Sequence, residues 1–160
     1  MISLIVAYSK NRVIGSKNAL PWQGRMPADS RYFQAMTLDK TVIMGRATYE
    51  SIGRALPKRQ NIVLSRTPFQ APGVIAARSL DEAYSLATGE IMVIGGGEVY
   101  RQALGTADVV YATLIDIEVE GDTTFPELGS EWKETYREDH EADEKNAFPY
   151  SFITYTKIES

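Results

Sequence analysis

Short apolar runs alternate with helix-forming segments along most of this chain. The apolar runs are typical of buried strands, and they cover residues 3–9, 41–45, 61–66, 73–77, 90–97 and 109–119. Segments with helical periodicity or capping signals cover residues 27–36, 46–53, 79–87 and 98–104. Strands that alternate with helices predict a mostly parallel central sheet with helices on both faces.

The last part of the chain changes to a two-residue alternation of apolar and polar side chains. Residues 132–141 and 149–159 show this alternation, and residues 145–149 are the expected turn between them. The pair predicts an antiparallel C-terminal hairpin at the edge of the sheet. The 160 residues show no internal repeat and no linker, so we expect a single α/β domain over residues 1–160.

Composition narrows the class of protein. Cysteine is absent, which removes disulfides, thiolate metal sites and thiol catalysis. The start of the chain has no basic leader before an apolar core, and no apolar run reaches the roughly 18–20 residues of a membrane span. These features predict a cytoplasmic protein that does not bind membranes. No segment has the character of an exposed apolar partner face, so a monomer is expected.

The charged residues are unevenly distributed. Residues 1–80 carry 12 Lys and Arg against 3 Asp and Glu, whereas residues 81–160 carry 5 against 18. The net charge of −4 argues against a nucleic-acid partner. The basic first half either meets an anionic ligand or forms a solvated surface unlike that of the second half.

The ends of the predicted strands indicate where a ligand binds. In open α/β sheets, ligands bind beyond the carboxyl ends of the strands. This rule places a site next to Ala7, Gly45, Ser65, Gly95 and Thr113.

Glycines and arginines at these strand ends suit a phosphate. Residues 95–97 are three glycines between a strand and a helix, which either approach a phosphate or form a tight structural turn. Arg46 and Arg66 each follow a strand, with Thr48 and Ser65 as hydroxyl donors. Two guanidinium groups at neighbouring strand ends bind a phosphate dianion well, so this set predicts a dinucleotide phosphate site.

Asp29 lies on the apolar face of the helix expected from Pro27. At about 100° per residue, Asp29 falls on the same side as Tyr32, Phe33 and Met36. The carboxylate either complements the helix dipole or lies in an apolar pocket, where it binds a polar ligand.

Two further residues, His140 and Arg59, are candidates for a functional role. His140, the only histidine, falls in the alternating acidic segment and is expected to be solvated. With one histidine and no cysteine, no metal site is expected. Arg59 directly precedes a strand, where it either binds a carboxylate or lies on the surface.

Taken in order, these segments resemble the dihydrofolate reductase family. The resemblance covers nearly the whole chain and rests on IVAYSKNRVIG, ALPW, PAD–RYF, TVIMGR, TYESIGRALP, NIVLSR, EIMVIGGGEVY, YATLID and EGDTTFP. Each segment alone is a modest signal, whereas their joint order and spacing are specific. The family reduces 7,8-dihydrofolate to 5,6,7,8-tetrahydrofolate with NADPH, supports one-carbon metabolism and nucleotide synthesis, and binds antifolate inhibitors.

The resemblance implies a catalytic set of Asp29, Trp22 and Thr113. Asp29 matches the carboxylate that binds the amidine-like edge of the pterin and favours protonation of the ring nitrogen, with a water as the proton donor. Trp22 matches the holder of a water near Asp29, and Thr113 matches a hydrogen-bond partner of the carboxylate. Arg59 matches the arginine that pairs with the α-carboxylate of the substrate's glutamate tail. The other expected substrate contacts are Ile5, Ala7, Ser30, Phe33, Ile52, Arg54, Leu56, Ile94 and Tyr100.

The resemblance also implies the contacts of NADPH. Those at the nicotinamide are Ala7, Ile14, Leu20 and Tyr100. Those at the phosphates and adenosine are Arg46, Thr48, Ser65, Arg66 and Arg78. The rest of the expected cofactor cleft is Gly15, Asn18, Gly45, Ala47, Leu64, Ile94, Gly95, Gly96, Gly97, Glu98 and Val99. The peptide bond between Gly95 and Gly96 matches one that is cis in this family.

Three positions depart from the family pattern. Residues 23–26 make the active-site loop longer than in the common short bacterial form. Ser30 stands where many bacterial members have an apolar residue, and Glu98 stands where some members carry Arg.

Two alternatives remain open on the sequence alone. One is another small NADPH-dependent reductase on a related fold, and Asp29 beside Trp22 argues against it. The other is a nucleotide-binding module without catalysis. The complete set of Trp22, Asp29, Phe33 and Thr113 argues against this second alternative.

Overall fold

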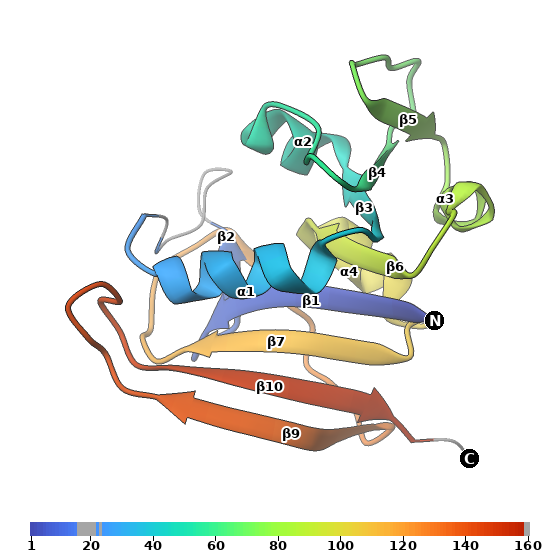
Figure 1. The fold of residues 1–160 in the computed structure, drawn as a ribbon. Coiled ribbons are helices and arrows are strands. Elements are labelled where there is room, and N and C mark those ends of the chain that lie inside the picture. Colours follow the sequence, from blue (N-terminus) through green and yellow to red (C-terminus); the bar gives the residue numbers. More distant parts are fainter. Residues whose placement is uncertain (16–21, 23, 159–160) are drawn as a thin grey trace.

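One eight-stranded sheet organises the molecule, with the strand order β5-β4-β3-β6-β1-β7-β10-β9 (Figure 1). The structure is a computed structural model and describes residues 1–15, 22 and 24–158. The strands of this sheet are β1 (Ile2–Ser9), β3 (Thr41–Gly45), β4 (Gln60–Leu64), β5 (Val74–Ala77), β6 (Ile91–Gly95), β7 (Val109–Ile115), β9 (Trp132–His140) and β10 (Tyr150–Lys157). The strands from β5 to β7 pair in parallel, and β10 is antiparallel to both β7 and β9. The predicted α/β sheet with an antiparallel C-terminal hairpin is therefore confirmed.

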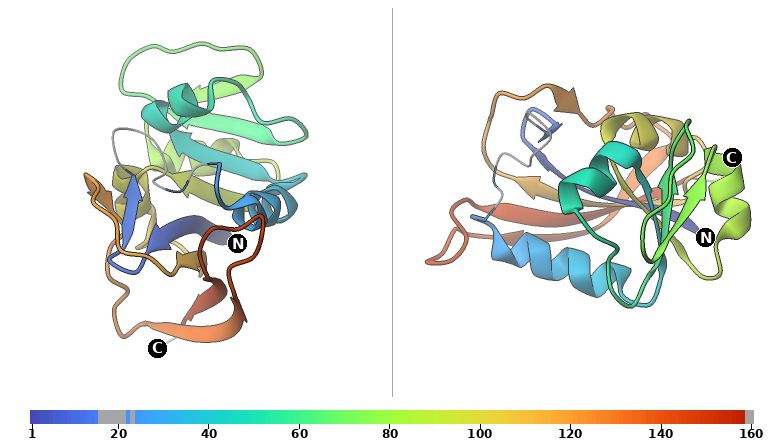
Figure 2. Two further views of the ribbon diagram at one scale, coloured as in Figure 1. Left: turned by 90° about the vertical axis from the view of Figure 1, so that its left-hand side faces the viewer. Right: turned by 90° about the horizontal axis from the view of Figure 1, so that it is seen from above.

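Helices cover both faces of the sheet, as expected. They are α1 (Pro27–Thr37), α2 (Arg46–Ile52), α3 (Leu80–Leu86) and α4 (Gly97–Ala103). Figure 2 shows α1 and α4 on opposite sides of the sheet. Ile5 of β1 packs in the same cluster as Phe33 of α1, whereas Leu4 packs with Val99 of α4. Because neighbouring residues of β1 face opposite buried layers, the strand is continuously apolar from Leu4 to Tyr8 rather than alternating.

Three features of the fold differ from the sequence-based expectation. A small second sheet pairs β2 (Val13–Gly15) with β8 (Thr123–Thr124), and neither strand was expected. The prediction that a strand extends to residue 119 is wrong, because β7 ends at Ile115. Beyond this point the chain turns, and the N–H of Ile117 donates to the Ile115 carbonyl at 2.8 Å. The connection between β9 and β10 spans residues 141–149, which is longer than the expected turn.

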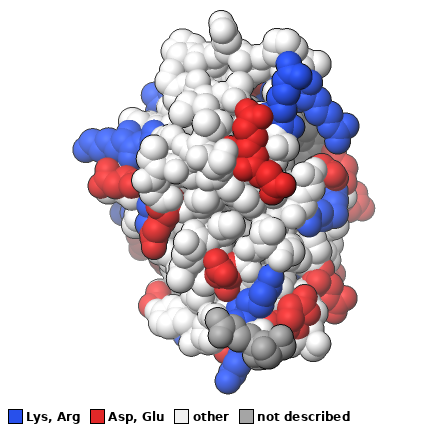
Figure 3. Space-filling model, turned by 90° about the vertical axis from the view of Figure 1, so that its right-hand side faces the viewer, with Lys and Arg blue, Asp and Glu red and all other residues white. Residues whose placement is uncertain are grey.

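The carboxyl ends of β1 and β7 lie side by side at one end of the sheet, on the left in Figure 1. There Ala7 of β1 pairs with Thr113 of β7, and Met44 of β3 pairs with Gly95 of β6. At the opposite end of the molecule, Lys and Arg are interspersed with Asp and Glu (Figure 3). No described helix is long and apolar enough to cross a membrane.

Candidate active site

Asp29 lies in the first turn of α1 and faces β7. Pro27 begins the helix, and its fixed φ and missing N–H suit that position. The half-buried Asp29 carboxylate accepts a hydrogen bond from the Thr113 hydroxyl. Burial raises the pKa of Asp29 to about 6, and the hydrogen bond from Thr113 opposes that rise. The carboxylate therefore lies against a buried threonine of the sheet.

Apolar side chains surround this part of α1. Ile5, Ile94, Phe33 and Leu56 all belong to one cluster that lies between α1 and the sheet. The structure thus brings together four of the expected substrate walls. Other expected contacts lie outside this cluster: Ile52 at the end of α2 is 37% exposed, and Ser30 and Arg54 are exposed as well.

Trp22 is fully buried beside the start of α1. It packs in one cluster with Met26, Ile115 and Phe152, and Ala7 packs against the same cluster. Among the described residues, its indole Nε1 is one of two buried side-chain atoms without a hydrogen-bond partner; the other belongs to Trp132. Because buried donors are normally satisfied, this N–H is a candidate donor to a ligand or a water.

Tyr100 joins the two strands between which the expected substrate and cofactor sites meet. Its hydroxyl lies 2.7 Å from the Ile5 carbonyl and 2.9 Å from the Ile94 carbonyl. The neighbouring Gly95 has φ +125°, and a Cβ there would lie 3.2 Å from the Tyr100 hydroxyl oxygen. Both conformation and space therefore require glycine at this position.

The glycine run is closely packed against α2 and β8. The peptide bond between Gly95 and Gly96 is cis, as the resemblance implied. A Cβ on Gly96 would lie 3.3 Å from the Thr48 hydroxyl oxygen, and one on Gly97 would lie 2.5 Å from a Thr123 methyl group. A side chain at Gly97 would collide with Thr123, and one at Gly96 would crowd Thr48, so glycine lets α4 and β6 approach these residues closely.

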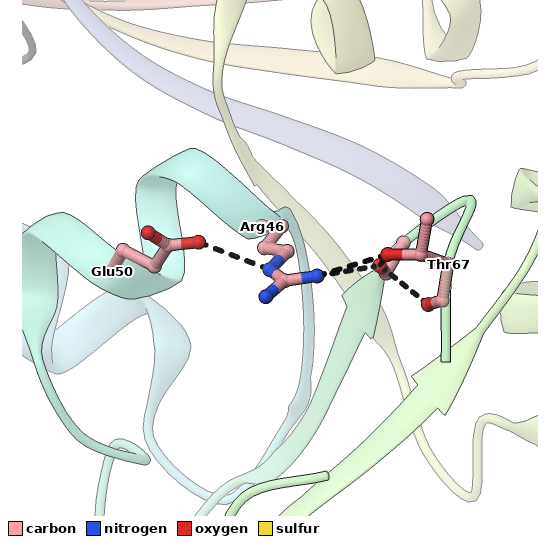
Figure 4. A network of polar contacts seen from close by, with 4 residues as sticks. Arg46, Glu50 and Thr67 are labelled. Carbon is pink, nitrogen blue, oxygen red and sulfur yellow. Dashed lines mark hydrogen bonds and ion pairs between the residues drawn. The ribbon is translucent and has the colours of Figure 1, made fainter. Parts of the chain in front are cut away.

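Arg46 is held at the first position of α2 by a polar network (Figure 4). Its Nη1 donates to the Thr67 hydroxyl at 3.0 Å and lies 3.5 Å from the Ser65 hydroxyl. Its Nε donates to Glu50 at 3.0 Å, and the guanidinium lies 4.8 Å from the centre of the Phe69 ring. Neither Thr67 nor Phe69 was predicted, although Thr67 directly follows Ser65 and Arg66, and Phe69 lies two residues further on.

A groove of about 520 Å³ lies beside this network. Its lining residues are Ser65, Thr67, Pro68, Phe69, Gln70, Ala76, Ala77, Arg78 and Glu82. The groove thus brings together Ser65 and Arg78, which were expected to share a phosphate or adenosine site. Arg66 is exposed in the same loop but does not line this groove.

Arg59 is held at the far end of α1. Its Nε donates to the Thr37 hydroxyl at 2.9 Å, and its Nη2 donates to the Gln34 carbonyl at 2.9 Å. Its Nη1 donates to the Pro57 carbonyl at 2.6 Å. Burial lowers the pKa of Arg59, and nearby Asp39 opposes that effect. Among the described residues, no acid forms an ion pair with Arg59, so its charge is available to an anion.

The remaining expected contacts divide into four groups. Ile14 packs in the cluster of Tyr100, and Gly15 pairs with Thr123. Gly45 and Leu64 end β3 and β4, Ala47 lies in the first turn of α2, and Val99 lies in α4, after β6. Glu98 is exposed and lies 3.6 Å from Arg101 in an ion pair. Asn18 and Leu20 lie outside the described residues.

His140 is not simply solvated, which corrects the expectation from the sequence. Its ring stacks on Tyr150 with centroids 4.8 Å apart, and its Nε2 lies 2.5 Å from Glu138. Within the described parts of the chain, no group of three or more His, Asp or Glu residues is placed to hold a metal ion.

Comparisons with known proteins agree with this arrangement. Residues 1–157 match the family model described as dihydrofolate reductase. Dihydrofolate reductase type 3 of Salmonella typhimurium is 50% identical over 161 residues, with 98% of each chain covered. Dihydrofolate reductase of Haemophilus influenzae is 48% identical over 158 residues, which cover 97% of this chain and 98% of that protein.

A solved structure supports the same assignment. Dihydrofolate reductase from Enterococcus faecalis, complexed with NADP(H) and RAB-propyl, has a TM-score of 0.92 and 36% identity to this chain. The match covers 99% of this chain and 97% of that one. The chain belongs to the dihydrofolate reductase family, whose members are NADPH-dependent oxidoreductases.

Proposed function

We propose that this chain transfers a hydride from NADPH to the pterin of 7,8-dihydrofolate, with protonation of the adjacent ring nitrogen, to give 5,6,7,8-tetrahydrofolate and NADP⁺. One observation carries the proposal: the half-buried Asp29 carboxylate on α1 accepts a hydrogen bond from Thr113 of β7, and neighbouring residues of α1 pack in an apolar cluster against the sheet. NADPH supplies the hydride when it is bound. The protein supplies position and electrostatics.

Asp29 holds and polarises the pterin in this proposal. With a pKa of about 6, Asp29 is mostly ionised near neutral pH. Its two oxygens accept from the two donors of the amidine-like edge, and its negative charge favours protonation of the ring nitrogen. Trp22 holds a water near the carboxylate, since its buried Nε1 has no partner among the described residues. A different water, at the edge of the ring opposite to Asp29, delivers the proton, because Asp29 is too far from the ring nitrogen to do so.

The apolar cluster holds the rings of the substrate, and Arg59 holds its tail. Ile5, Phe33, Leu56 and Ile94 enclose the pterin and benzoyl rings. Arg59 is fixed by Thr37, Gln34 and Pro57, so its guanidinium is positioned before the α-carboxylate of the glutamate tail arrives. Expected contacts at Ala7, Ser30, Ile52, Arg54 and Tyr100 complete this part of the proposal.

The residues at the strand ends fit NADPH. In this proposal NADPH lies beside Tyr100 and Ile14, next to the glycines of residues 95–97, which Tyr100, Thr48 and Thr123 pack closely. Arg46, Thr48 and Ser65, with Arg66 and Arg78, bind the phosphates and adenosine in this proposal. The groove that contains Ser65 and Arg78 supports that placement, because it is open and carries hydroxyl and guanidinium donors.

The proposal also covers the domain organisation, oligomeric state, compartment and partners of the protein. We place one domain over residues 1–160, a monomer, in the cytoplasm, without nucleic-acid or membrane partners. Antifolates that pair with the pocket carboxylate are expected to inhibit the enzyme.

Oxidation of NADPH, followed by absorbance with and without dihydrofolate, tests the function. A diaminopyrimidine antifolate serves as the control, because it carries the amidine-like edge that Asp29 recognises. We expect turnover that requires dihydrofolate and is abolished by the antifolate. The absence of dihydrofolate-dependent turnover would exclude this function and leave the nucleotide-binding module.

A further inference from the structure

The connection between β9 and β10 places a buried amide against the start of α1. Asn146 lies in this connection and is only 2% exposed. Its Oδ1 accepts a hydrogen bond from the Ala28 N–H at 2.9 Å. Ala28 directly precedes Asp29, so a residue 118 positions away in the chain is bonded next to the pocket carboxylate.

Asp143 fixes which way the Asn146 amide points. Its Oδ1 accepts the backbone N–H of Asn146 at 2.7 Å and that of Lys145 at 2.9 Å. Its two oxygens also lie 3.1 and 3.2 Å from Asn146 Nδ2. An ionised carboxylate only accepts hydrogen bonds, so the NH₂ group of Asn146 must face Asp143 and its oxygen must face Ala28.

Helix α1 has no local side chain that performs this task. Its N-cap residue is Met26, which forms no side-chain hydrogen bond to the first turn. Pro27 has no N–H, so Ala28 carries the first N–H of the helix that needs a partner. Asn146 therefore acts as the N-terminal cap of α1, supplied from the far end of the chain.

The same hairpin also holds the hydrogen-bond partner of Asp29. Phe152 of β10 pairs with Thr113 of β7 in the sheet. The Phe152 ring also stacks on Tyr32 of α1, with centroids 4.1 Å apart and planes at 14°. The hairpin thus contacts α1 at Ala28 and at Tyr32, on either side of Asp29, while it pairs with the strand that carries Thr113.

We infer that Asn146 is a positioning residue, which fixes the start of α1 so that the Asp29 carboxylate stays within reach of the Thr113 hydroxyl. This inference rests on the proposed function for its catalytic consequence. Asn146 touches neither substrate nor cofactor and acts only through Ala28. A shift of the first turn would move Asp29 away from Thr113 and from the pterin edge together.

The test uses the full-length enzyme with Asn146→Ala and a matched control, Lys145→Ala. Lys145 is exposed in the same connection, and only its backbone N–H takes part in the turn. We expect Asn146→Ala to lower kcat by roughly ten- to a hundredfold, because misplacement of a catalytic group by about 1 Å costs on that order. The KM for NADPH should change little.

A second readout separates positioning from mere stability. The pKa of Asp29 in the free enzyme can be followed by ¹³C NMR of carboxyl-labelled aspartate. In Asn146→Ala it should rise above its value in the parent, because Asp29 loses the hydrogen bond from Thr113 that lowers it. Lys145→Ala should leave the pKa of Asp29, kcat and the melting temperature unchanged.

Asp143→Ala provides a test if Asn146→Ala fails to fold. Removal of the orienting carboxylate should lower kcat and raise the pKa of Asp29, as in Asn146→Ala, but by smaller amounts. If a folded variant loses thermal stability while both kcat and the Asp29 pKa match the parent, Asn146 is only a structural cap and the inference is overturned. A parent enzyme without dihydrofolate-dependent turnover would instead refute the proposed function, and the NMR result would still decide the geometry.

Discussion

The Thr113 hydroxyl donates a hydrogen bond to the Asp29 carboxylate, from the end of β7 to the first turn of α1. Thr113 is only 1% exposed, so its hydroxyl has little access to solvent. The bond stabilises the ionised form of an acid that burial would otherwise keep protonated. The balance between these two effects gives Asp29 a pKa of about 6.

Thr113→Val should raise the pKa of Asp29 further. Valine keeps the shape of threonine and removes the hydroxyl, and a hydrogen bond to a charged group contributes about 1.5–3 kcal/mol. Less of the enzyme is then ionised near neutral pH, so affinity for a diaminopyrimidine antifolate and turnover of dihydrofolate should both fall. Titration by ¹³C NMR measures the pKa directly. Ser151→Ala, on the neighbouring strand, is a control that should leave that pKa unchanged.

Asp29→Asn should fold and lose most of its activity near neutral pH. The amide keeps the size of the side chain but lacks the charge that favours the protonated pterin. The expected loss in kcat is on the order of a hundredfold or more, the scale of one electrostatic contact in a site that excludes water. Activity should partly recover in acid, where the substrate is protonated more readily. Equal rates for variant and parent near neutral pH would reduce Asp29 to a helix-stabilising residue.

The same substitution should stabilise the folded protein at neutral pH. The pKa of Asp29 is raised from 3.8 to about 6 in the folded state, so the folded chain binds the proton more tightly than the unfolded chain does. Stability therefore falls as the pH rises from about 4 to about 6, by up to about 3 kcal/mol. Denaturation of parent and Asp29→Asn should show the variant more stable above pH 6, with the difference disappearing near pH 4. A constant difference across this range would contradict the raised pKa.

Arg59→Ala should raise the KM for dihydrofolate and leave the KM for NADPH unchanged. The guanidinium is half-buried and already oriented by Thr37 and Gln34, so loss of its pair with a carboxylate should cost roughly 1–3 kcal/mol. A pterin substrate without the glutamate tail provides the control, because it offers Arg59 no carboxylate. An equal effect on that truncated substrate would contradict the assignment.

Arg46→Ala and Arg66→Ala should each weaken the binding of NADPH more than the binding of NADH. The two cofactors differ only by the phosphate on the adenosine ribose, and a hydrogen bond to a charged group is worth about 1.5–3 kcal/mol, or roughly ten- to a hundredfold. Both arginines are exposed, but Arg46 is already oriented by Ser65 and Thr67, so the larger effect should come from Arg46. Added salt should narrow the preference for NADPH.

Quenching of tryptophan fluorescence measures both affinities for each variant. If the losses for NADPH and NADH are equal, these arginines contact the shared pyrophosphate or shape the groove, and do not distinguish the extra phosphate. The double variant need not show the sum of the single effects, since both guanidinium groups would share one phosphate.

The elements that the sequence predicted well are those with a strong local signal. Strand β1 contains a continuous apolar run, and α1 is long enough to show a helical period, so both have a clear local signal. The strands β2 and β8 have three and two residues, so no period exists to detect, and they pair only because Asp122 and Phe125 bond back to residues near β2. The end of β7 was missed for a related reason: Ile117 is apolar like the strand, yet it bonds outside the sheet.

Within the candidate site, the sequence located residues on the strand ends better than those on loops. Asp29 and Phe33 were predicted to share a face because they lie on one helix. Thr67 and Asn146 were missed because their roles depend on contacts between distant segments, such as the hydrogen bond from Ala28 to Asn146. A buried asparagine in a polar loop has no signature in sequence, because its burial follows from the packing of the hairpin.

The order of strands in the sheet has a consequence for how the enzyme acquires its activity. The central strand β1 pairs Ile2 with Ile91 and Ser3 with Val109, so its neighbours lie about ninety to a hundred residues away in the chain. Such high contact order makes folding slow, since long loops must close before these contacts form. A chain emerging from the ribosome cannot place Asp29 against Thr113 until β7 has been synthesised. Binding competence during refolding should therefore appear late, together with the central strand pairing and after the local helices have formed.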